Sequence, residues 1–489
     1  MQVIEKSMGK NQLLKTIGSS HDLVALQSLI VQGKEWILQR QRALGLDFEQ
    51  RDKIFEQFFA GITAVKSVGA SILLGQIFDS VGFNTIKDEL FRKLVLSRLC
   101  YPVSKLKTTE YLRRYEGYVT DEDKIYRYLY KLNKTQKRTV QCISYKHTLQ
   151  VLGGQISMVF YDVTTLYFEA SEEDELRKTG YSKDGRHQNP QIVLGLLVSK
   201  GGYPLAYEIF EGGKFEGHTM LPVVNLFRRK YKVSELIVVA DAGLLSDKNM
   251  RVLRENKYSY ILGGRIKNES DRIKSELLKL ALSNGEIAEL QKDEINRLII
   301  SYSSSRAVKD AMNRERGVRK LSKLIETGKL PKKQVNNKSY NRFLKLEGEV
   351  TITLDEAKVE DDKKWDGLKG YVTNCALSKE EIITNYGYLW QIEKAFLVAK
   401  SEIKIRPFYH RLKGRIEAHV CIAFVAYKLY KELERLLKEK KSGLTPEKAI
   451  EIAKTIYQVE AILPHSKQPM SKLLINTEEQ RYLAKLFNF

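Results

Sequence analysis

The chain has 489 residues, of which 43% are hydrophobic and 29% are charged. This composition excludes a disordered or fibrous protein, and the length exceeds what one hydrophobic core usually supports. Lysine and arginine number 82 against 60 aspartates and glutamates, a formal net charge of +22, which favours an anionic partner, most commonly nucleic acid. A general lysine bias in an A/T-rich genome would produce the same excess, so composition alone leaves both readings open.

Three further classes of protein are disfavoured. The four cysteines are scattered and form no C-x2-C pair, which argues against a disulfide framework and a structural zinc site. The first fifteen residues carry neither an apolar core nor a small-residue cleavage site, so they do not form a secretory signal. The longest apolar stretch, residues 418–427, is about half the length of a membrane span. We therefore expect a cytoplasmic protein without a membrane partner.

Residues 1–150 are predicted to form a helical N-terminal DNA-binding region. Its last part, residues 98–150, carries 12 Lys and Arg against 5 Asp and Glu. We expect two short helices here, one capped by Ser104 and stopped by Gly117, the other capped by Thr120. The pair resembles a helix–turn–helix, and these basic residues are predicted to point outward: Lys105, Lys107, Arg113, Arg114, Arg127, Lys131 and Lys134. An ordinary helical hairpin with a solvated basic face is the alternative.

From residue 151 to 265 the hydrophobic period changes to that of strands. Three apolar runs at residues 156–161, 193–198 and 204–210 predict an antiparallel meander. A helix at 219–231, a strand at 236–240, a helix at 246–255 and a strand at 258–262 follow. This order predicts an α/β fold, a ribonuclease-H-like mixed sheet flanked by helices.

Two acidic residues stand at strand ends of this predicted sheet. Asp162 follows the first strand and Asp241 follows the fourth, and in this topology the two strands are neighbours. Their carboxylates should share one crevice at the edge of the core, where an isolated charge is costly. Either aspartate could instead cap a turn. Together they favour a metal site.

The rest of the chain is predicted to form three segments. Residues 266–365 read as an inserted basic domain with a strand pair at 298–302 and 350–354. Residues 366–430 would complete the catalytic domain with a long helix over 381–407. Residues 431–489 would be a helical C-terminal region whose apolar side chains form either a dimer surface or a capping subdomain.

The long predicted helix carries an ordered set of side chains on one side. Spacing places these residues within about 60° of one another: Tyr386, Leu389, Glu393, Lys400 and Lys404. Glu393 borders the apolar stripe, where a carboxylate needs a cation or a donor nearby. A solvated helix face would show the same Glu and Lys spacing.

Asp162, Asp241 and Glu393, with the pattern Tyr386-x2-Leu389-x3-Glu393-x6-Lys400, resemble the catalytic triad and the Y-x2-R-x3-E-x6-K signature of DDE transposases from bacterial insertion sequences. The similarity is to the cut-and-paste branch that has a β-rich insertion before its Glu, and it covers about residues 90–430. Similar stretches include residues 160–165, 180–184, 241–243 and 405–410. The signature Arg is Leu389 here, so its implied contact with the DNA backbone is missing or is supplied by Lys394 or Arg406.

The resemblance implies an enzyme of the bacterial cytoplasm, associated with the nucleoid, that cuts DNA with two Mg²⁺ ions, for which Mn²⁺ can substitute. Carboxylates suit Mg²⁺, whereas His or Cys would suit it poorly. We expect Asp162 to bridge both ions, Asp241 to hold one and Glu393 to hold the other. The expected partners are double-stranded DNA, as terminal inverted repeats and target, and a second copy of the chain on paired ends.

DNA contacts are expected outside the triad as well. Tyr386 and Lys400 would grip the phosphate beside the cut, and Trp390 lies near a position where relatives stack an aromatic ring on a displaced base. Further contacts are expected from Lys404, Arg406, Lys105, Arg113, Arg127 and Lys131. Two rival functions stay open: a catalytically inactive DNA-binding regulator, and a metal-dependent nuclease that does not join strands. A nucleotide-hydrolysing enzyme is improbable because no G-x4-G-K-[ST] loop occurs.

Overall fold

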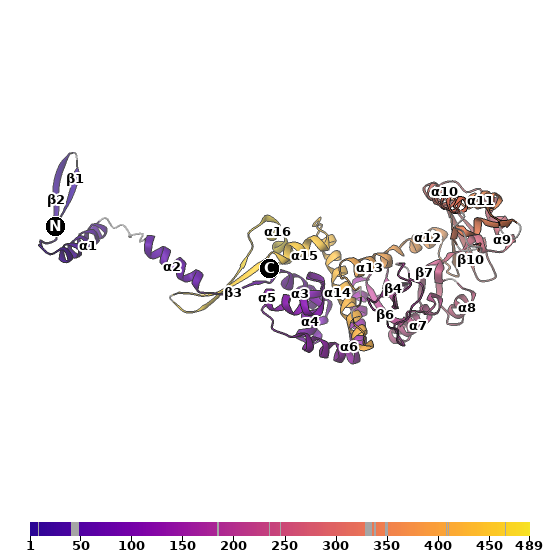
Figure 1. The fold of residues 1–489 in the computed structure, drawn as a ribbon, viewed down its shortest axis with the longest axis horizontal. Helices are drawn as coiled ribbons and strands as arrows, with labels where there is room; N and C mark the ends of the chain where they lie inside the picture. The colour runs from indigo at the N-terminus through magenta and orange to yellow at the C-terminus, as the bar shows by residue number, and fades with distance from the viewer. Residues whose placement is uncertain are drawn as a thin grey trace. The chain divides into compact units, whose positions relative to one another are not determined.

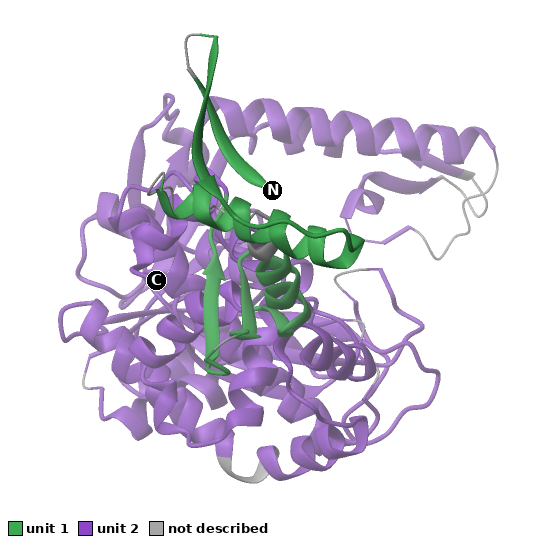
Figure 2. Cartoon of the chain, turned by 90° about the vertical axis from the view of Figure 1, so that its left-hand side faces the viewer, with its two compact units in different colours: residues 1–67, 456–476 green, residues 68–455, 477–489 purple. Residues whose placement is uncertain are grey.

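The computed structural model describes residues 1–7, 9–40, 48–182, 185–233, 235–244, 246–327, 335–336, 339–347, 351–406, 408, 410–464 and 466–489. Two compact units make up the chain (Figure 2): unit 1 contains residues 1–67 and 456–476, and unit 2 contains residues 68–455 and 477–489. The helices and strands carry the labels of Figure 1. Within the described residues, no helix is both long enough and apolar enough to span a membrane.

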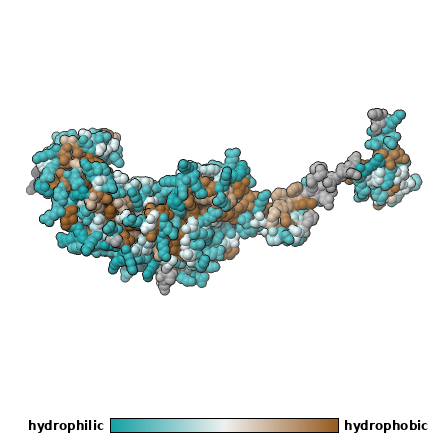
Figure 3. All heavy atoms as spheres, turned by 180° about the vertical axis from the view of Figure 1, so that it is seen from behind, coloured by the Kyte–Doolittle hydropathy of each residue, from teal (hydrophilic) through white to brown (hydrophobic). Residues whose placement is uncertain are grey.

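Unit 1 combines strands from both ends of the chain. A hairpin of β1 (Gln2–Ser7) and β2 (Lys10–Thr16) precedes α1 (Leu23–Arg40) and α2 (Phe48–Ala60). A second sheet has the order β15-β14-β3, with β3 at Ile62–Ser67, β14 at Tyr457–Ile462 and β15 at Pro469–Leu474. Hydrophobic side chains are exposed along α2 (Figure 3), where Phe55 is 60% and Phe59 is 66% exposed.

The sequence predicted a helical N-terminal region and a helical C-terminal region, and these strands correct that prediction for parts of both. Val65 pairs with Val459, a partner almost four hundred residues away. A local pattern of side chains cannot reveal such a pairing, because each strand gains its hydrogen bonds only from the distant one.

Unit 2 is built on an eight-stranded mixed sheet with the order β6-β5-β4-β7-β8-β13-β10-β9. Its strands are β4 (Met158–Tyr167), β5 (Gln191–Ser199), β6 (Pro204–Glu211), β7 (Ile237–Ala240), β8 (Ser259–Gly264), β9 (Ile287–Gln291), β10 (Arg297–Tyr302) and β13 (Leu368–Thr373). Strands β4, β7 and β8 are parallel, and the other neighbours are antiparallel. The arrangement is mixed α/β, and the predicted order of its first five strands is confirmed.

Unit 2 also contains helices, some of which pack on the sheet. They are α3 (Gly69–Val81), α4 (Glu89–Cys100), α5 (Lys105–Glu116), α6 (Glu122–Val151), α7 (Met220–Tyr231), α8 (Asp247–Glu255), α9 (Asp271–Lys279), α10 (Ser304–Glu326), α11 (Glu356–Lys363), α12 (Lys379–Gly387), α13 (Trp390–Ser401), α14 (Lys413–Glu439), α15 (Pro446–Lys454) and α16 (Glu478–Phe487). One core packs β4 and β7 against α13 and α14, and a second packs the opposite sheet face against α7 and α8. Each strand therefore alternates its side chains between two cores.

The helix pair α5–α6 differs from the prediction in its second member. Ser104 caps α5, and Gly117 ends it in a left-handed conformation, both as predicted. Asp121, rather than Thr120, caps α6, which then continues for 30 residues to Val151. The helix is long because residues 118–151 contain no Gly or Pro to stop it.

The segment predicted as an insertion contributes to the main sheet. Strand β10 lies between β13 and β9, whereas β12 (Thr351–Leu354) pairs with β11 (Leu344–Glu347). The predicted pairing of residues 298–302 with 350–354 is therefore wrong. Both strands exist, but each has a different partner.

The apolar residues of the C-terminal helices are also placed differently. Leu433, Leu437, Ala449 and Ala453 are at most 2% exposed and belong to the core of unit 2. These four side chains pack inside the chain's own fold, so they do not form the dimer surface that was one of the two alternatives. The other alternative, that the C-terminal region forms a capping subdomain, stays a prediction.

Candidate active site

The pairing of β4 with β7 places two carboxylates side by side. The sequence predicts Asp162 at the end of the first strand. Strand β4 instead continues through Asp162 to Tyr167, so this aspartate lies within the strand. Tyr161 pairs with Ala240 in parallel register. Asp162 comes next within β4, and Asp241 comes directly after the end of β7. Neighbouring strands lie about 4.8 Å apart. The two carboxylates thus start from adjacent backbone positions.

Both aspartates belong to the sheet face that α13 covers. Phe160 and Val239, each two residues earlier on its strand, are buried in the core that contains α13. Side chains two residues apart point to the same face of a sheet, so Asp162 and Asp241 follow them. Figure 1 shows α13 close to β4, and the two elements are in contact.

Glu393 lies in the first turn of α13 and is exposed to solvent. Its neighbour Ile392 is fully buried in the same core, which holds the helix against the sheet. The predicted single helix over 381–407 is wrong, because α12 ends at Gly387 and α13 begins at Trp390. At the junction, the ring of Tyr388 packs edge-on against Phe160 with centroids 6.4 Å apart.

Tyr386 connects α12 with the second aspartate. Its hydroxyl donates a hydrogen bond to Asp241 Oδ1 at 3.2 Å. Gly263 on β8 makes room for this contact, because a Cβ there would stand 2.6 Å from the Tyr386 hydroxyl. Burial, followed by the charge of Asp241, raises the pKa of Tyr386 above its usual range. Tyr386 therefore remains a neutral hydrogen-bond donor.

Lys369 on β13 is a cation near the site that the sequence pattern did not indicate. Its ammonium lies 4.5 Å from the ring centroid of Tyr386 and 5.3 Å from that of Tyr371. Burial and the nearby Arg306 lower the pKa of Lys369, whereas the charges of Asp241 and Glu393 oppose that shift. Lys369 thus lies within electrostatic range of two of the three carboxylates. No motif identifies it, because only the pairing of β13 with β8 brings it there.

The donor set of the site suits a hard divalent cation. Asp162, Asp241 and Glu393 provide carboxylate oxygens, which Mg²⁺ prefers, and Mg²⁺ keeps several water ligands. Among the residues that the structure describes, no three His, Cys, Asp or Glu side chains stand close enough to form a metal-binding cluster by themselves. The residue types therefore fit the ion, but the described structure does not bring all three carboxylates within reach of one metal ion.

The predicted DNA contacts near Glu393 have different surroundings. Trp390 is 48% exposed, with the Lys394 ammonium 6.0 Å from its ring centroid. Lys400 is half-buried in the last turn of α13. Lys404 lies beyond that helix at a positive φ of 49°, so its predicted alignment with Glu393 is wrong. Arg406 lies with its guanidinium carbon 5.8 Å from the ring centroid of Tyr167.

The residue at the signature Arg position cannot contact DNA. Leu389 is 7% exposed and forms part of the core. Of the two residues expected to replace the Arg, Lys394 is paired with Glu434 at 2.5 Å. The contact that the signature Arg would make therefore has no direct substitute at Lys394 while this ion pair holds.

Among the predicted contacts of the N-terminal helices, three are accessible and one is not. Arg113 on α5 and Arg127 and Lys131 on α6 are exposed, as predicted. Lys105 is only 7% exposed, so its predicted outward position is wrong. It is the first residue of α5 and points toward α4 and α14 rather than to open solvent, as its place in a cavity with Arg98 and His419 indicates.

A family model described as the Transposase DDE domain matches residues 153–429 of the chain. This span includes Asp162, Asp241 and Glu393 and covers more than half of the sequence. The chain belongs to the DDE transposases. Membership in this family makes it an enzyme of DNA strand cleavage and transfer.

Comparison with solved structures finds the cryo-EM structure of the piggyBac transposase synaptic complex with hairpin DNA. It is 9% identical, with a TM-score of 0.39, and the alignment covers 89% of this DDE transposase and 79% of that chain. No curated protein sequence matches the chain.

Proposed function

We propose that this DDE transposase serves a bacterial insertion sequence, cutting the ends of its element and joining the freed 3′-hydroxyls to target DNA. One observation carries the proposal. The register of β4 and β7 sets Asp162 beside Asp241, and Glu393 lies on the helix that packs over the same sheet face. Three carboxylates from separate parts of the chain thus belong to this sheet face or to the helix that packs on it.

Each of these residues has a proposed role. Asp162, Asp241 and Glu393 would hold two Mg²⁺ ions. Such a pair of ions activates an attacking oxygen and stabilises a leaving oxygen in phosphodiester chemistry. The Tyr386 hydroxyl orients Asp241 through its hydrogen bond. Lys369 balances the negative charge of Asp241 and Glu393, and Lys400 and Trp390 would contact the DNA flanking the cut.

The partners follow from the reaction. Two element ends must be cut and joined together, so we propose that two copies of the chain act on paired ends. The exposed Arg113, Arg127 and Lys131 would bind the duplex of the terminal repeat through its phosphates. A net charge of +22 supports binding to an anionic partner such as DNA.

Cleavage of a duplex that carries the element end tests the proposal. We expect the wild type to cut in Mg²⁺ and not in EDTA, and Glu393→Gln to lose about 10³-fold in rate while still binding DNA. Glu402→Gln is the matched control, because Glu402 is exposed just beyond the end of α13, and it should cut at the wild-type rate.

Adding a target plasmid to the wild-type reaction separates the rival functions. Plasmid joined to the element end supports transposition. Cutting without joining would identify a nuclease instead. Binding without cutting by the wild type would leave only a DNA-binding regulator.

A further inference from the structure

A second charged site lies in unit 2 around the loop between α4 and α5. A cavity of about 440 Å³ is lined by Arg98, Pro102, Val103, Ser104, Lys105, Lys107, Tyr126, Lys404, Arg406, His410 and His419. Five of these side chains are Lys or Arg and two are His, and the described lining includes no Asp or Glu. We refer to this cavity as the cationic socket.

The innermost cation of the socket is Lys105. It is 7% exposed, and its ammonium makes no hydrogen bond or ion pair with any residue that the structure describes. A buried charge without a partner is strongly unfavourable in a folded protein. Burial and the nearby Arg98 lower the pKa of Lys105 to about 7, which expresses the same cost. An anionic ligand that pairs with Lys105 would remove this free-energy cost.

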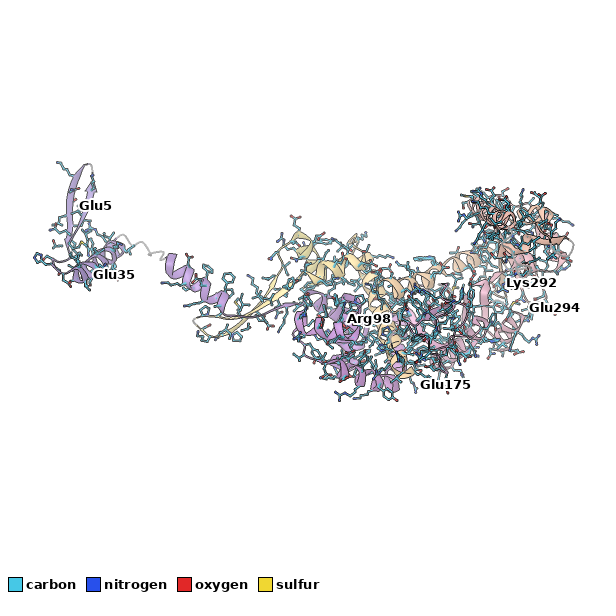
Figure 4. The ribbon with its side chains drawn as sticks, in the orientation of Figure 1. Glu5, Glu35, Arg98, Glu175, Lys292 and Glu294 are labelled. Atoms are coloured by element: carbon cyan, nitrogen blue, oxygen red, sulfur yellow. The ribbon has the colours of Figure 1, made fainter. Side chains whose placement is uncertain are left out.

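Arg98, which is labelled in Figure 4, lines the socket together with Lys105. Its guanidinium donates to the carbonyl oxygens of Val103 at 3.1 Å and Lys404 at 2.9 Å, and it lies 3.0 Å from His419 Nε2. These neutral partners fix the group in place without neutralising it. The Nε atom of Arg98 is buried and has no partner among the described atoms.

The backbone contributes to the same preference for an anion. Lys105 is the first residue of α5, a helix of 12 residues capped by Ser104. The first N–H groups of a helix lack partners within it and attract negative charge. Here the helix start, the buried Lys105 and the fixed Arg98 line one cavity.

The two buried histidines of the socket add no charge to it. Their rings lie 5.3 Å apart, and both are at most 8% exposed. Burial and repulsion by Lys105 and Arg98 lower the pKa of His410 to about 3 and that of His419 well below its ordinary value. Both rings are therefore neutral in the ligand-free protein, and they can offer hydrogen bonds to a ligand.

We propose that the cationic socket binds a backbone phosphate of the DNA substrate, away from the cleaved bond, through Lys105, Arg98 and the first turn of α5. Arg406 contacts Tyr167 at the end of β4, and Tyr167 lies five residues beyond Asp162 on that strand, about 17 Å away. The socket thus reaches β4 well away from Asp162, and its described lining includes none of the three carboxylates. The inference rests on the proposed function for the identity of the ligand as DNA, whereas a phosphate ion in solution offers the same chemistry.

Lys105→Met in the full-length protein tests the proposal. The apolar replacement fits a buried position, so the ligand-free variant should melt at a higher temperature than the wild type. Inorganic phosphate should raise the melting temperature of the wild type but not that of the variant. Lys105→Arg keeps the charge and should keep the phosphate response. Lys124→Met removes the same charge from an exposed position outside the socket lining and should behave like the wild type.

DNA binding separates the two sources of phosphate. In EDTA, where no cleavage occurs, Lys105→Met should bind the element-end duplex about tenfold more weakly. The slope of log affinity against log salt should become less steep by about 0.9, the value for one phosphate contact. Loss of the phosphate response with unchanged DNA affinity would overturn DNA as the ligand.

A lower melting temperature together with an intact phosphate response would overturn the socket itself. Failure of the proposed function remains distinguishable from these results. A wild type that binds no DNA but still responds to phosphate would refute the transposase proposal and leave the anion site standing.

Discussion

Two basic cavities in unit 2 have similar volumes, but among the described residues only one of them is also lined by carboxylates. The cavity between β13 and α10 measures about 410 Å³ and is lined by six Lys or Arg side chains, but also by Asp310, Asp362 and Asp366. There Arg314 forms two hydrogen bonds of 2.6 Å with Asp366, and Asp362 pairs with Lys267 and Arg342. The cationic socket, at about 440 Å³, has no carboxylate in its described lining.

The presence or absence of carboxylates in the lining indicates which of the two basic cavities is suited to an anionic ligand. In the first cavity most of the positive charge is satisfied inside the protein, so removing a cation leaves an unpaired carboxylate. In the socket the charge of Lys105 has no partner among the described residues, so removing this cation should relieve the free protein and weaken only ligand binding. The count of basic residues is similar in both, and the location of the counter-charges decides their role.

The largest effect that we expect is on stability, in the cavity between β13 and α10, which we call the paired cavity. This effect tests the comparison most severely. Arg314→Met should lower the free energy of unfolding by about 3 kcal/mol, because it leaves Asp366 without its buried partner. Arg314 has a side-chain exposure of 7%. Arg316→Met, at an exposed position on the same helix, should change stability by less than about 0.5 kcal/mol. Denaturant unfolding followed by circular dichroism measures both.

If Arg314→Met proved as stable as Arg316→Met, the paired cavity would not depend on its ion pairs. The contrast with the socket would then disappear.

A smaller effect concerns the pH dependence of the socket. The pKa of Lys105 is about 7 in the folded protein and about 10.4 in an unfolded chain. Between these values the unfolded chain binds more protons, so the wild type gains stability as pH rises. The cost of Lys105 is complete below pH 7. Lys105→Met should therefore be more stable than the wild type by about 2 kcal/mol at pH 6, and this gain should fade toward pH 10.

The neighbours of Lys105 do not mask this trend between pH 6 and 9. The pKa of Arg98 on α4 is lowered to about 10, that of His410 to about 3, and that of Tyr126 on α6 is raised to about 12. His419 on α14 has a pKa well below its ordinary value. Lys107, Lys404 and Arg406 complete the charged lining. Thermal melting of both proteins across this range provides the measurement, and a gain independent of pH would contradict the assignment to Lys105.

The sequence was informative wherever function depends on local patterns. Apolar runs predicted the first five strands of the sheet, and the placement of Asp162 and Asp241 after such runs followed from them. The order of those strands is confirmed, and with it the neighbourhood of the two aspartates. The family resemblance rested on Glu393 and its spacing from Tyr386 in the sequence. The break between α12 and α13 does not change that spacing.

The sequence was uninformative wherever distant segments meet. Lys369 approaches Tyr386 only because β13 pairs with β8 after a long intervening segment. Lys105 was predicted to face solvent because helix periodicity describes a helix alone, whereas residues of α4 and α14 line the cavity around Lys105. The pairing of β3 with β14 joins opposite ends of the chain. In each example a long-range contact determines the environment of the side chain.

The central claim is that the carboxylates beside β4 and β7 bind the metal ions that cut DNA. Asp241→Cys tests it most directly, because a thiolate is a softer ligand that accepts Mn²⁺ more readily than Mg²⁺. The account predicts that the variant fails to cut the element end in Mg²⁺ and recovers part of its activity in Mn²⁺, while the wild type cuts in both. Cutting in Mg²⁺ at the wild-type rate, or no recovery in Mn²⁺, would contradict it.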